Sequence, residues 1–161
     1  MNADDWIQQL QLLPHPEGGY YKETYRSKES VFFLGFEGRR NTSTAIYFLL
    51  KEKDKSHFHR IKSDELWFFH EGSSLEIFCL SENGLQTILL GKNSKEGEQL
   101  QAIIPAGNWF AAKIKDETGF SLVSCTVAPG FDFQDFELAE KELLEKEFPS
   151  HKRLIEVMTL K

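Results

Sequence analysis

Two histidines and a glutamate that lie close together in the sequence are the residues most able to carry chemistry. His57 and His59 belong to the segment SHFHRIKSDELWFFHEG, and Glu65 follows them before Gly72. On a β-strand, residues two apart point to the same face, so both imidazoles can reach one point in space. Glu65 begins the next apolar run, and a returning strand could bring its carboxylate beside them. Inside a β-barrel, these groups would form either a metal site or an acid–base pocket.

Acid–base chemistry without a metal needs a base, a group that orients it and an acid. A histidine takes up a proton readily when a neighbouring carboxylate fixes its tautomer, and Glu65 or Asp64 could be that carboxylate. The candidate acids are three tyrosines on the early strands, and the sequence does not place any of them at the pocket: Tyr21, Tyr25 and Tyr47.

The elements that must position these residues are short strands. About ten apolar segments are separated by turn residues at intervals of roughly 8–12 positions, which is typical of an all-β sandwich or barrel. We expect this barrel at about residues 18–129 of a single domain that spans residues 1–161. Cys79 and Cys125 lie in strand-like runs and are interpreted as buried free thiols.

A helix is expected on each side of the barrel. Apolar residues recur at helical spacing at about residues 4–13, with Asp4 or Asp5 available to cap the first turn. A second helix is expected at about residues 135–148, capped by Asp135 and ended by Pro149.

Composition and charge exclude several classes of protein. The chain has 161 residues and a formal net charge of −6, which disfavours binding to nucleic acid or to anionic membranes. No run of 18 apolar residues is present, so no membrane span is expected. The N-terminus is acidic and lacks the apolar core of a secretory signal, so we expect a cytoplasmic protein.

The histidine segment resembles the first motif of the cupin superfamily, which is His, one residue, His, a spacer, Glu, six residues and Gly. The second cupin motif contains Pro-x-Gly, two residues and a final histidine. Here Pro105 and Gly107 match, but Phe110 stands in place of that histidine. The spacer between His59 and Glu65 is also one residue longer than usual.

Longer strings resemble one branch of this superfamily, the cupin-5 or DUF985 family. They are LPHPEGGYYKETYRS, STAIYFLL, SHFHRIKSDELWFFHEG, IPAGNWFAA and CTVAPGFDFQDFEL, and they fall in order over about residues 10–159. The resemblance implies a double-stranded β-helix, or jelly roll, and a homodimer. Apolar runs such as VFFL and LWFF also favour a dimer, because both faces of those strands need cover. The family has no settled activity.

A metal would have to rest on three protein ligands, because Phe110 cannot coordinate one. His57, His59 and Glu65 with a water molecule would form a legitimate catalytic shell for Zn, Mn, Fe or Ni. The alternative is that these histidines line an organic-ligand pocket or are satisfied by hydrogen bonds. Jelly-roll epimerases that act on nucleotide-linked sugars offer a metal-free precedent, with a histidine base and a tyrosine acid.

Several other residues are candidates for contact with a ligand. Trp67 and Phe69 share the face of Glu65 by strict alternation, so they either wall the cavity or pack in the core. His70 alternates to the opposite face, and His15 is interpreted as a turn residue. A pocket role is open to Glu17. The further candidates are Phe110, Tyr47, Glu23 and Arg26.

The sequence is compatible with three functions. The first is a cupin that binds a small polar or cyclic organic molecule, with or without a divalent metal, and acts on it. The second is a metal-free sugar or nucleotide-sugar epimerase or isomerase. The third is a ligand sensor or carrier with no enzymatic activity.

Overall fold

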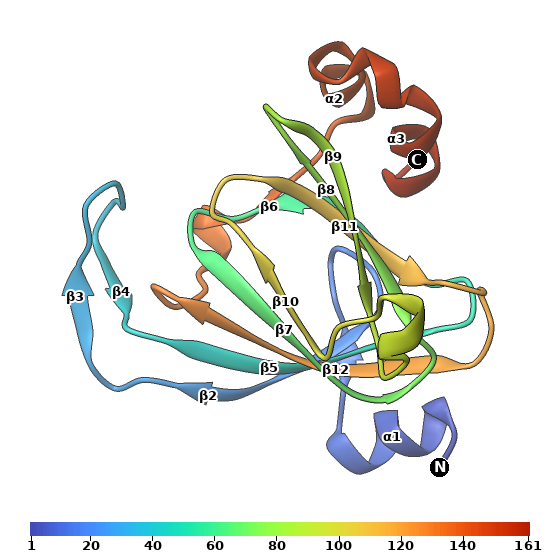
Figure 1. The fold of residues 1–161 in the computed structure, drawn as a ribbon. Helices are drawn as coiled ribbons and strands as arrows, with labels where there is room; N and C mark the ends of the chain where they lie inside the picture. The colour runs from blue at the N-terminus through green and yellow to red at the C-terminus, as the bar shows by residue number, and fades with distance from the viewer.

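The computed structural model describes residues 1–161 and consists mainly of antiparallel strands in two sheets that face each other (Figure 1). The predicted all-β class and jelly-roll architecture are confirmed, and helices flank the strands on both sides. No helix is both long enough and apolar enough to cross a membrane.

The six-stranded sheet has the order β1-β2-β5-β12-β7-β10. Its strands in that order are β1 (Leu13–Pro14), β2 (Tyr20–Arg26), β5 (Thr44–Lys51), β12 (Phe120–Ala128), β7 (Asp64–Gly72) and β10 (Gln101–Ile104). The five-stranded sheet has the order β13-β6-β11-β8-β9. Its strands are β13 (Glu137–Leu138), β6 (Lys55–Arg60), β11 (Trp109–Ile114), β8 (Leu75–Ser81) and β9 (Gly84–Leu90).

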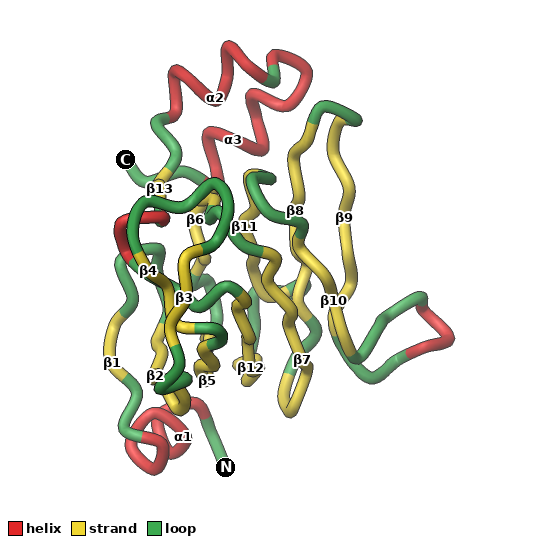
Figure 2. Tube along the Cα trace, turned by 90° about the vertical axis from the view of Figure 1, so that its left-hand side faces the viewer, coloured by secondary structure: helices red, strands yellow, loops and turns green.

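A separate hairpin of β3 (Ser30–Phe32) and β4 (Arg39–Asn41) extends from the body of the barrel, on the left of Figure 1. Three short 3-10 helices complete the chain, η1 (Ser94–Glu96), η2 (Phe133–Asp135) and η3 (Pro149–His151). Figure 2 shows the two sheets edge-on, with the C-terminal helices beyond the strands of the five-stranded sheet.

The main core lies between the two sheets. Alternation along β7 turns Glu65, Trp67 and Phe69 to the interior, and all three are buried. Phe110 of β11 packs in the same cluster as Trp67, so the inner face of the five-stranded sheet meets that of the six-stranded sheet here. Burying this apolar surface is the main force that holds the sheets together.

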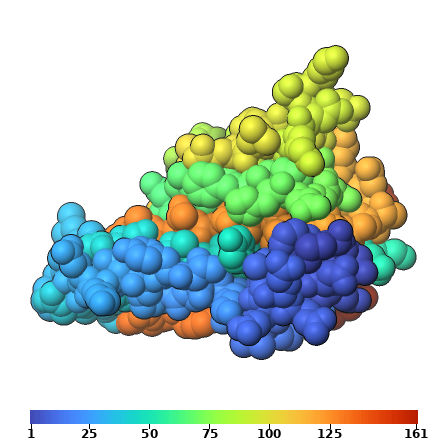
Figure 3. Space-filling view, turned by 90° about the horizontal axis from the view of Figure 1, so that it is seen from below, coloured from blue at the N-terminus to red at the C-terminus, as the bar shows by residue number.

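The N-terminal helix, α1 (Ala3–Leu10), begins before both of its predicted caps, Asp4 and Asp5. Asn2 is the cap, and Asp5 completes a reciprocal capping box with it. The apolar side of α1 covers Leu49 and Leu122 on the outer face of the six-stranded sheet. In Figure 3, α1 is the dark blue patch beside the lighter blue N-terminal strands.

The C-terminal segment differs from the single helix predicted at 135–148. Helix α2 spans Lys141–Glu147, and a further helix, α3 (Lys152–Met158), follows η3. Asp135 does not cap a helix, because its carboxylate is engaged by Arg40. Both helices cover the outer face of the five-stranded sheet, where Phe58 and Trp109 are buried against them.

A bulge in β6 interrupts the alternation that the histidine prediction relied on. In the pairing with β11, His59 lies opposite Phe110 and Ser56 lies opposite Ala112, so β6 has one residue more than its partner over this stretch. Ser56 and His59 both point to the site described below, whereas Phe58 faces the C-terminal helices. His57 and His59 therefore do not share a face as an unbroken strand would require.

Candidate functional site

A small pocket of about 40 Å³ brings most of the buried titratable groups together. We call it the inner pocket, and it is lined by residues from both sheets, from the turn before β2 and from the segment after β12. These residues are His15, Glu17, Tyr21, Thr44, Ile46, His59, Ile61, Glu65, Cys125, Val127, Phe131 and Phe136.

Glu17 and His59 form a buried ion pair in this pocket. The Nε2 atom of His59 lies 2.9 Å from a carboxylate oxygen of Glu17, and the other carboxylate oxygen accepts a hydrogen bond of 2.9 Å from the Ser56 hydroxyl. The second ring nitrogen of His59, Nδ1, faces the carbonyl oxygen of His57 at 2.7 Å. Both ring nitrogens of His59 thus face acceptors, so the imidazole is held as a doubly protonated cation against the carboxylate of Glu17.

The pKa shifts of the pair agree with this geometry. Burial opposes the charged form of His59, but the charge and hydrogen bond of Glu17 outweigh burial and raise the His59 pKa. Burial likewise acts to raise the pKa of Glu17, but the charge and hydrogen bond of His59 prevail and lower it. Each residue keeps the other ionised in a place where neither would be ionised alone.

The pKa of Glu65 is shifted in the opposite direction from that of Glu17. Burial raises its pKa from 4.5 to about 7, with a further increase from the negative charge of Glu17, although the charge of His59 acts against this. The thiol of Cys125 and the indole of Trp67 are its polar neighbours and favour the ionised form only slightly. Trp67 Nε1 has no partner at normal hydrogen-bond geometry. Glu65 is therefore a carboxyl group that exchanges its proton near neutral pH.

His15 is a neutral histidine on the wall of the inner pocket. Its Nδ1 accepts a hydrogen bond of 3.1 Å from the backbone N–H of Glu17, so its proton sits on Nε2. Burial lowers the pKa of His15 and favours this neutral form. Its ring packs edge-on against Tyr21, with 4.5 Å between the ring centres. His15 and Tyr21 supply neutral polar groups beside the charged pair.

The three residues predicted as a metal-binding set are only partly brought together. His59 and Glu65 line the inner pocket, but His57 does not. The Nδ1 atom of His57 donates to the carbonyl oxygen of Glu17 at 2.7 Å, because the bulge turns its ring toward the turn that contains Gly18. No group of three or more His, Cys, Asp or Glu side chains is arranged to hold a metal ion.

The predicted aromatic contacts lie mostly behind the pocket. Phe110 packs on His59 with 4.1 Å between the ring centres, and Trp67 and Phe69 are buried in the core. None of these three lines the inner pocket. Tyr47 lies on the outer face of its strand, where it packs near α1 and 6.0 Å from the ring of His70. Tyr47 therefore cannot contact a ligand in the barrel.

Two residues of the site were not predicted as catalytic candidates. His15 was interpreted as a turn residue, whereas a pocket role was left open for Glu17, and both line the pocket. The turn His15–Gly19 approaches β6 closely, since a Cβ atom on Gly18 would lie 2.0 Å from the carbonyl oxygen of Lys55. The string HPEGG indicated a turn whose paired glycines allow a close approach, but it did not show which strand the turn would approach.

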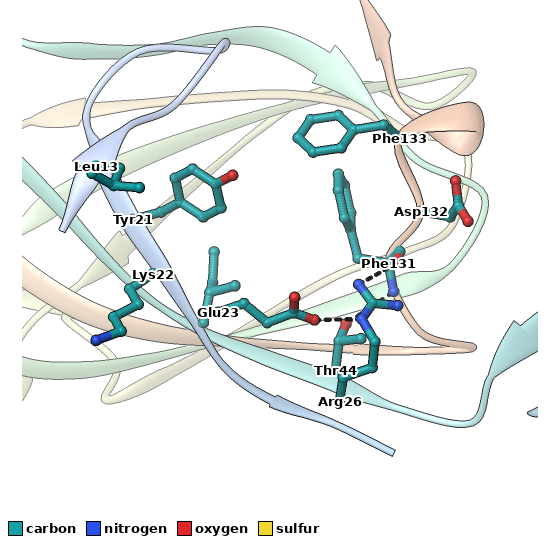
Figure 4. A pocket seen from close by; sticks show the side chains of 10 residues that line it. Leu13, Tyr21, Lys22, Glu23, Arg26, Thr44, Phe131, Asp132 and Phe133 are labelled. Atoms are coloured by element: carbon teal, nitrogen blue, oxygen red, sulfur yellow. Dashed lines mark hydrogen bonds and ion pairs between the residues drawn. The ribbon is translucent and has the colours of Figure 1, made fainter. Parts of the chain in front are cut away.

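A larger pocket of about 370 Å³ adjoins the inner one and is called the outer pocket (Figure 4). The two share the wall residues Tyr21, Thr44, Ile46 and Phe131. The remaining residues of the outer pocket are Leu13, Lys22, Glu23, Arg26, Asp132 and Phe133. Glu23 and Arg26, two of the predicted ligand contacts, thus lie here and not in the barrel interior.

Comparison with known proteins gives a consistent result. The model of the cupin superfamily family DUF985 matches residues 4–139. An uncharacterised protein of Saccharomyces cerevisiae is 30% identical over 86% of this chain and 74% of its own length.

Two solved structures match the fold of this chain over nearly its whole length. A hypothetical protein from Leishmania major has a TM-score of 0.92 and 37% identity, with all of both chains covered. A protein from Shewanella oneidensis has a TM-score of 0.90 and 42% identity over 99% of this chain and 98% of its own. Oxalate decarboxylase from Bacillus subtilis shares the fold alone, at a TM-score of 0.57 and 18% identity over 90% of this chain and 36% of its own.

Proposed function

This chain belongs to the DUF985 family of the cupin superfamily, and we propose that it binds a small organic molecule in the barrel and moves a proton on it without a metal. The class of reaction is isomerisation or epimerisation next to a carbonyl group. Glu65 is the residue that exchanges the proton. The Glu17–His59 pair positions and tunes it.

The observation that carries this proposal is the contrast between two carboxyl groups in one pocket. Glu17 is held ionised by His59, whereas burial raises the pKa of Glu65 to about 7. Groups whose environments push their pKa values apart are typical of acid–base sites, and a pKa near the working pH is best for proton transfer. His59 itself is a poor base, because both of its ring nitrogens are engaged by protein acceptors.

The proposed reaction balances without an oxidant or a co-reactant. Ionised Glu65 takes a proton from the carbon beside a carbonyl group, and the electron pair of the broken C–H bond moves toward the carbonyl oxygen. The hydroxyl of Tyr21, on the same pocket wall, can donate a hydrogen bond to that oxygen. Glu65 then returns the proton to carbon, and the product has the same atoms as the substrate.

The second candidate function is a reaction assisted by a metal ion, which the similarity to other cupin structures suggests. The related oxalate decarboxylase structures include one described by its Mn(II) centres. In this chain, however, His57 is turned away, Phe110 stands against His59, and both nitrogens of His59 serve other partners. The donors as arranged here do not fit Zn, Mn, Fe or Ni, and no step of the proposed reaction uses one.

Solvent exchange tests the proposal directly. The protein is incubated in deuterated water with a panel of small aldoses and ketoses, and deuterium incorporation beside the carbonyl is followed by proton NMR. We expect incorporation whose rate rises with pH around a midpoint near the Glu65 pKa of about 7 and which survives chelation with EDTA. Glu65→Gln should abolish it, whereas Glu71→Gln, a change on the same strand outside both pockets, should not.

Three other outcomes would contradict the proposal. Exchange that is lost with EDTA and restored by Mn²⁺ would favour the metal-assisted reading. Ligand binding with no exchange at any pH would favour a sensor or carrier. Exchange that persists in Glu65→Gln would show that another residue is the base.

A further inference from the structure

We propose that the outer pocket is a binding site for an uncharged planar ring, which forms the non-reacting part of the ligand whose reacting end enters the inner pocket. This inference rests on the proposed function for the identity of the inner site, but it concerns recognition and not catalysis. It excludes a nucleoside diphosphate as that part of the ligand.

The two pockets have sizes that suit two parts of one molecule. The inner pocket, at about 40 Å³, has room for a small group only, while the outer pocket, at about 370 Å³, falls within the range of ligand sites in proteins. Tyr21, Thr44, Ile46 and Phe131 line both, so a single ligand can extend from one into the other.

The walls of the outer pocket are suited to a flat ring. Figure 4 shows the rings of Tyr21, Phe131 and Phe133 around one open space, with Leu13 beyond Tyr21. Phe131 and Phe133 meet edge-to-face with 4.9 Å between their ring centres, so a further ring can stack on either face that they leave open. The side chain of Phe133 is half exposed at this pocket, and an exposed aromatic ring on a pocket wall is typical of a binding surface.

The charged groups around the outer pocket are already satisfied by the protein. Lys22 points away from the pocket and donates to Gln11 at 2.9 Å (Figure 4). Glu23 pairs with Arg26 at 2.7 Å. The carboxylate of Asp132 accepts a hydrogen bond from the backbone N–H of Gln134 at 3.0 Å.

Arg26 is the one guanidinium at this pocket, and each of its three nitrogens already has a protein acceptor. Besides Glu23, it donates to Asn41 at 2.9 Å and to the carbonyl oxygen of Phe131 at 3.0 Å. A diphosphate would have to compete with these contacts for Arg26, and it would meet the carboxylates of Glu23 and Asp132 at the same rim. The rim also carries two cations and two anions, so its net charge is zero and does not attract an anion.

The hydroxyl of Thr44 is a hydrogen-bond donor available to a ligand in the outer pocket. Its oxygen accepts a hydrogen bond of 2.9 Å from the backbone N–H of Phe131, so its proton is free to donate to a ligand acceptor. Because Thr44 lies on the wall shared by both pockets, that acceptor belongs at the junction between the ring and the reacting group.

Binding of simple probes tests this inference. Indole serves as the uncharged planar probe, cyclohexanol as the non-planar one and uridine diphosphate as the charged one, and each is titrated into isotope-labelled protein and followed by NMR. We expect indole to bind and to shift the signals of Phe131 and Phe133, with little dependence on salt. Cyclohexanol should bind more weakly, and uridine diphosphate should not bind at the outer pocket.

Variants locate the site and separate it from catalysis. Phe133→Ala should weaken indole binding roughly threefold to tenfold, while Phe32→Ala, an exposed phenylalanine on the separate hairpin, should not change it. Glu65→Gln should bind indole as the wild type does, so a failed reaction and a failed ring site give different results. Binding of uridine diphosphate as tight as that of indole, no binding of indole, or full binding by Phe133→Ala would each overturn the inference.

Discussion

Nε2 of His59 lies 2.9 Å from the carboxylate of Glu17, and this contact joins the turn before β2 to the five-stranded sheet. The pair is almost completely buried, with side-chain exposures of 3% and 8%. Two charges are kept out of water here only because each compensates the other and Ser56 adds a hydrogen bond. The shape of the inner pocket and the state of Glu65 both depend on this one contact.

Removing the charge of Glu17 should therefore destabilise the protein. Glu17→Gln leaves a buried His59 without its counter-charge, and we expect the free energy of unfolding at neutral pH to fall by roughly 3 kcal/mol. The pKa of His59 should fall as well, because burial then acts without opposition. Chemical denaturation measures the first effect and an NMR titration of His59 the second.

The matched control is Glu23→Gln. Glu23 is also paired with a cation, the guanidinium of Arg26, but this pair is about 40% exposed, so its loss should cost less than about 1 kcal/mol. Equal effects of the two substitutions would mean that the Glu17–His59 pair is not buried in solution.

The Glu17–His59 pair should stabilise the folded protein most within a limited range of pH. Because the pKa of Glu17 is lowered from 4.5, its contribution is present above that value and is lost as pH falls through its folded pKa. Because the pKa of His59 is raised from 6.5, its contribution is complete below that value and is lost as pH rises through its folded pKa. The stability difference between wild type and Glu17→Gln, measured by denaturation, should be largest between 4.5 and 6.5 and shrink on both sides. A difference that does not change with pH would contradict the pairing.

Glu65 should have the opposite effect on stability. The folded protein holds its proton up to about pH 7, whereas the unfolded chain releases it near 4.5, so stability falls as pH rises through this window. The rise to about 7 corresponds to about 3 kcal/mol once the group is ionised. Glu65→Gln removes this cost, so the variant should be more stable than the wild type above pH 7 and about equal to it near pH 4. Thermal unfolding at the two pH values measures this, and a variant that is less stable at both would show that Glu65 is not buried in an unfavourable environment.

The inner face of β7 illustrates what alternation can predict. Glu65, Trp67 and Phe69 point inward as expected, because the pairing of β7 with β12 is regular from Asp64 to Phe69 and its register shift comes only after Phe69. The type of the fold was predictable for the same reason, since each strand of an antiparallel barrel carries its own pattern of apolar residues.

His57 illustrates what alternation cannot predict. A bulge changes which residues share a face without leaving any mark in the apolar pattern, so Ser56 and not His57 joins His59 at the carboxylate of Glu17. The role of Glu17 depends on a contact between segments far apart in the sequence, and no local signal places it beside β6. The polar string HPEGG indicated a turn but not what that turn would approach.

A buried ion pair should help to hold the segment that carries Phe131, Phe133 and Phe136. Arg40 donates to both carboxylate oxygens of Asp135, at 2.7 and 2.8 Å, and is only 3% exposed. Arg40→Ala leaves Asp135 unpaired, and we expect a loss of about 3 kcal/mol in the free energy of unfolding. Indole binding should weaken at the same time, because Phe133 and Phe136 flank Asp135. Denaturation and NMR titration measure the two effects.

Arg39→Ala is the control for this substitution. Arg39 lies next to Arg40 on β4, is exposed and stacks over Phe32, so its removal should change stability by less than about 0.5 kcal/mol. Unchanged indole binding in Arg40→Ala would mean that the aromatic segment is held in place by other contacts.

The outer face of the six-stranded sheet should be the dimer interface. Cross-strand partners form a row on this face that runs from Ile103 through Leu66 and Thr126 to Ala45 and Tyr25. Ile103 and Tyr25 are 59% and 56% exposed, and α1 covers a different part of this sheet. An apolar row across several strands of a sheet is favourable only when another surface covers it, and a second copy of the chain supplies one.

Light scattering should therefore give twice the monomer mass of 18.6 kDa. Ile103→Lys places a charge in this apolar row, and we expect it to shift the protein toward monomers. Leu85→Lys is the matched control, since Leu85 is an exposed leucine on β9 of the other sheet and should leave the mass unchanged. A wild-type mass of 18.6 kDa would contradict the dimer, and dissociation by Leu85→Lys alone would move the interface to the five-stranded sheet.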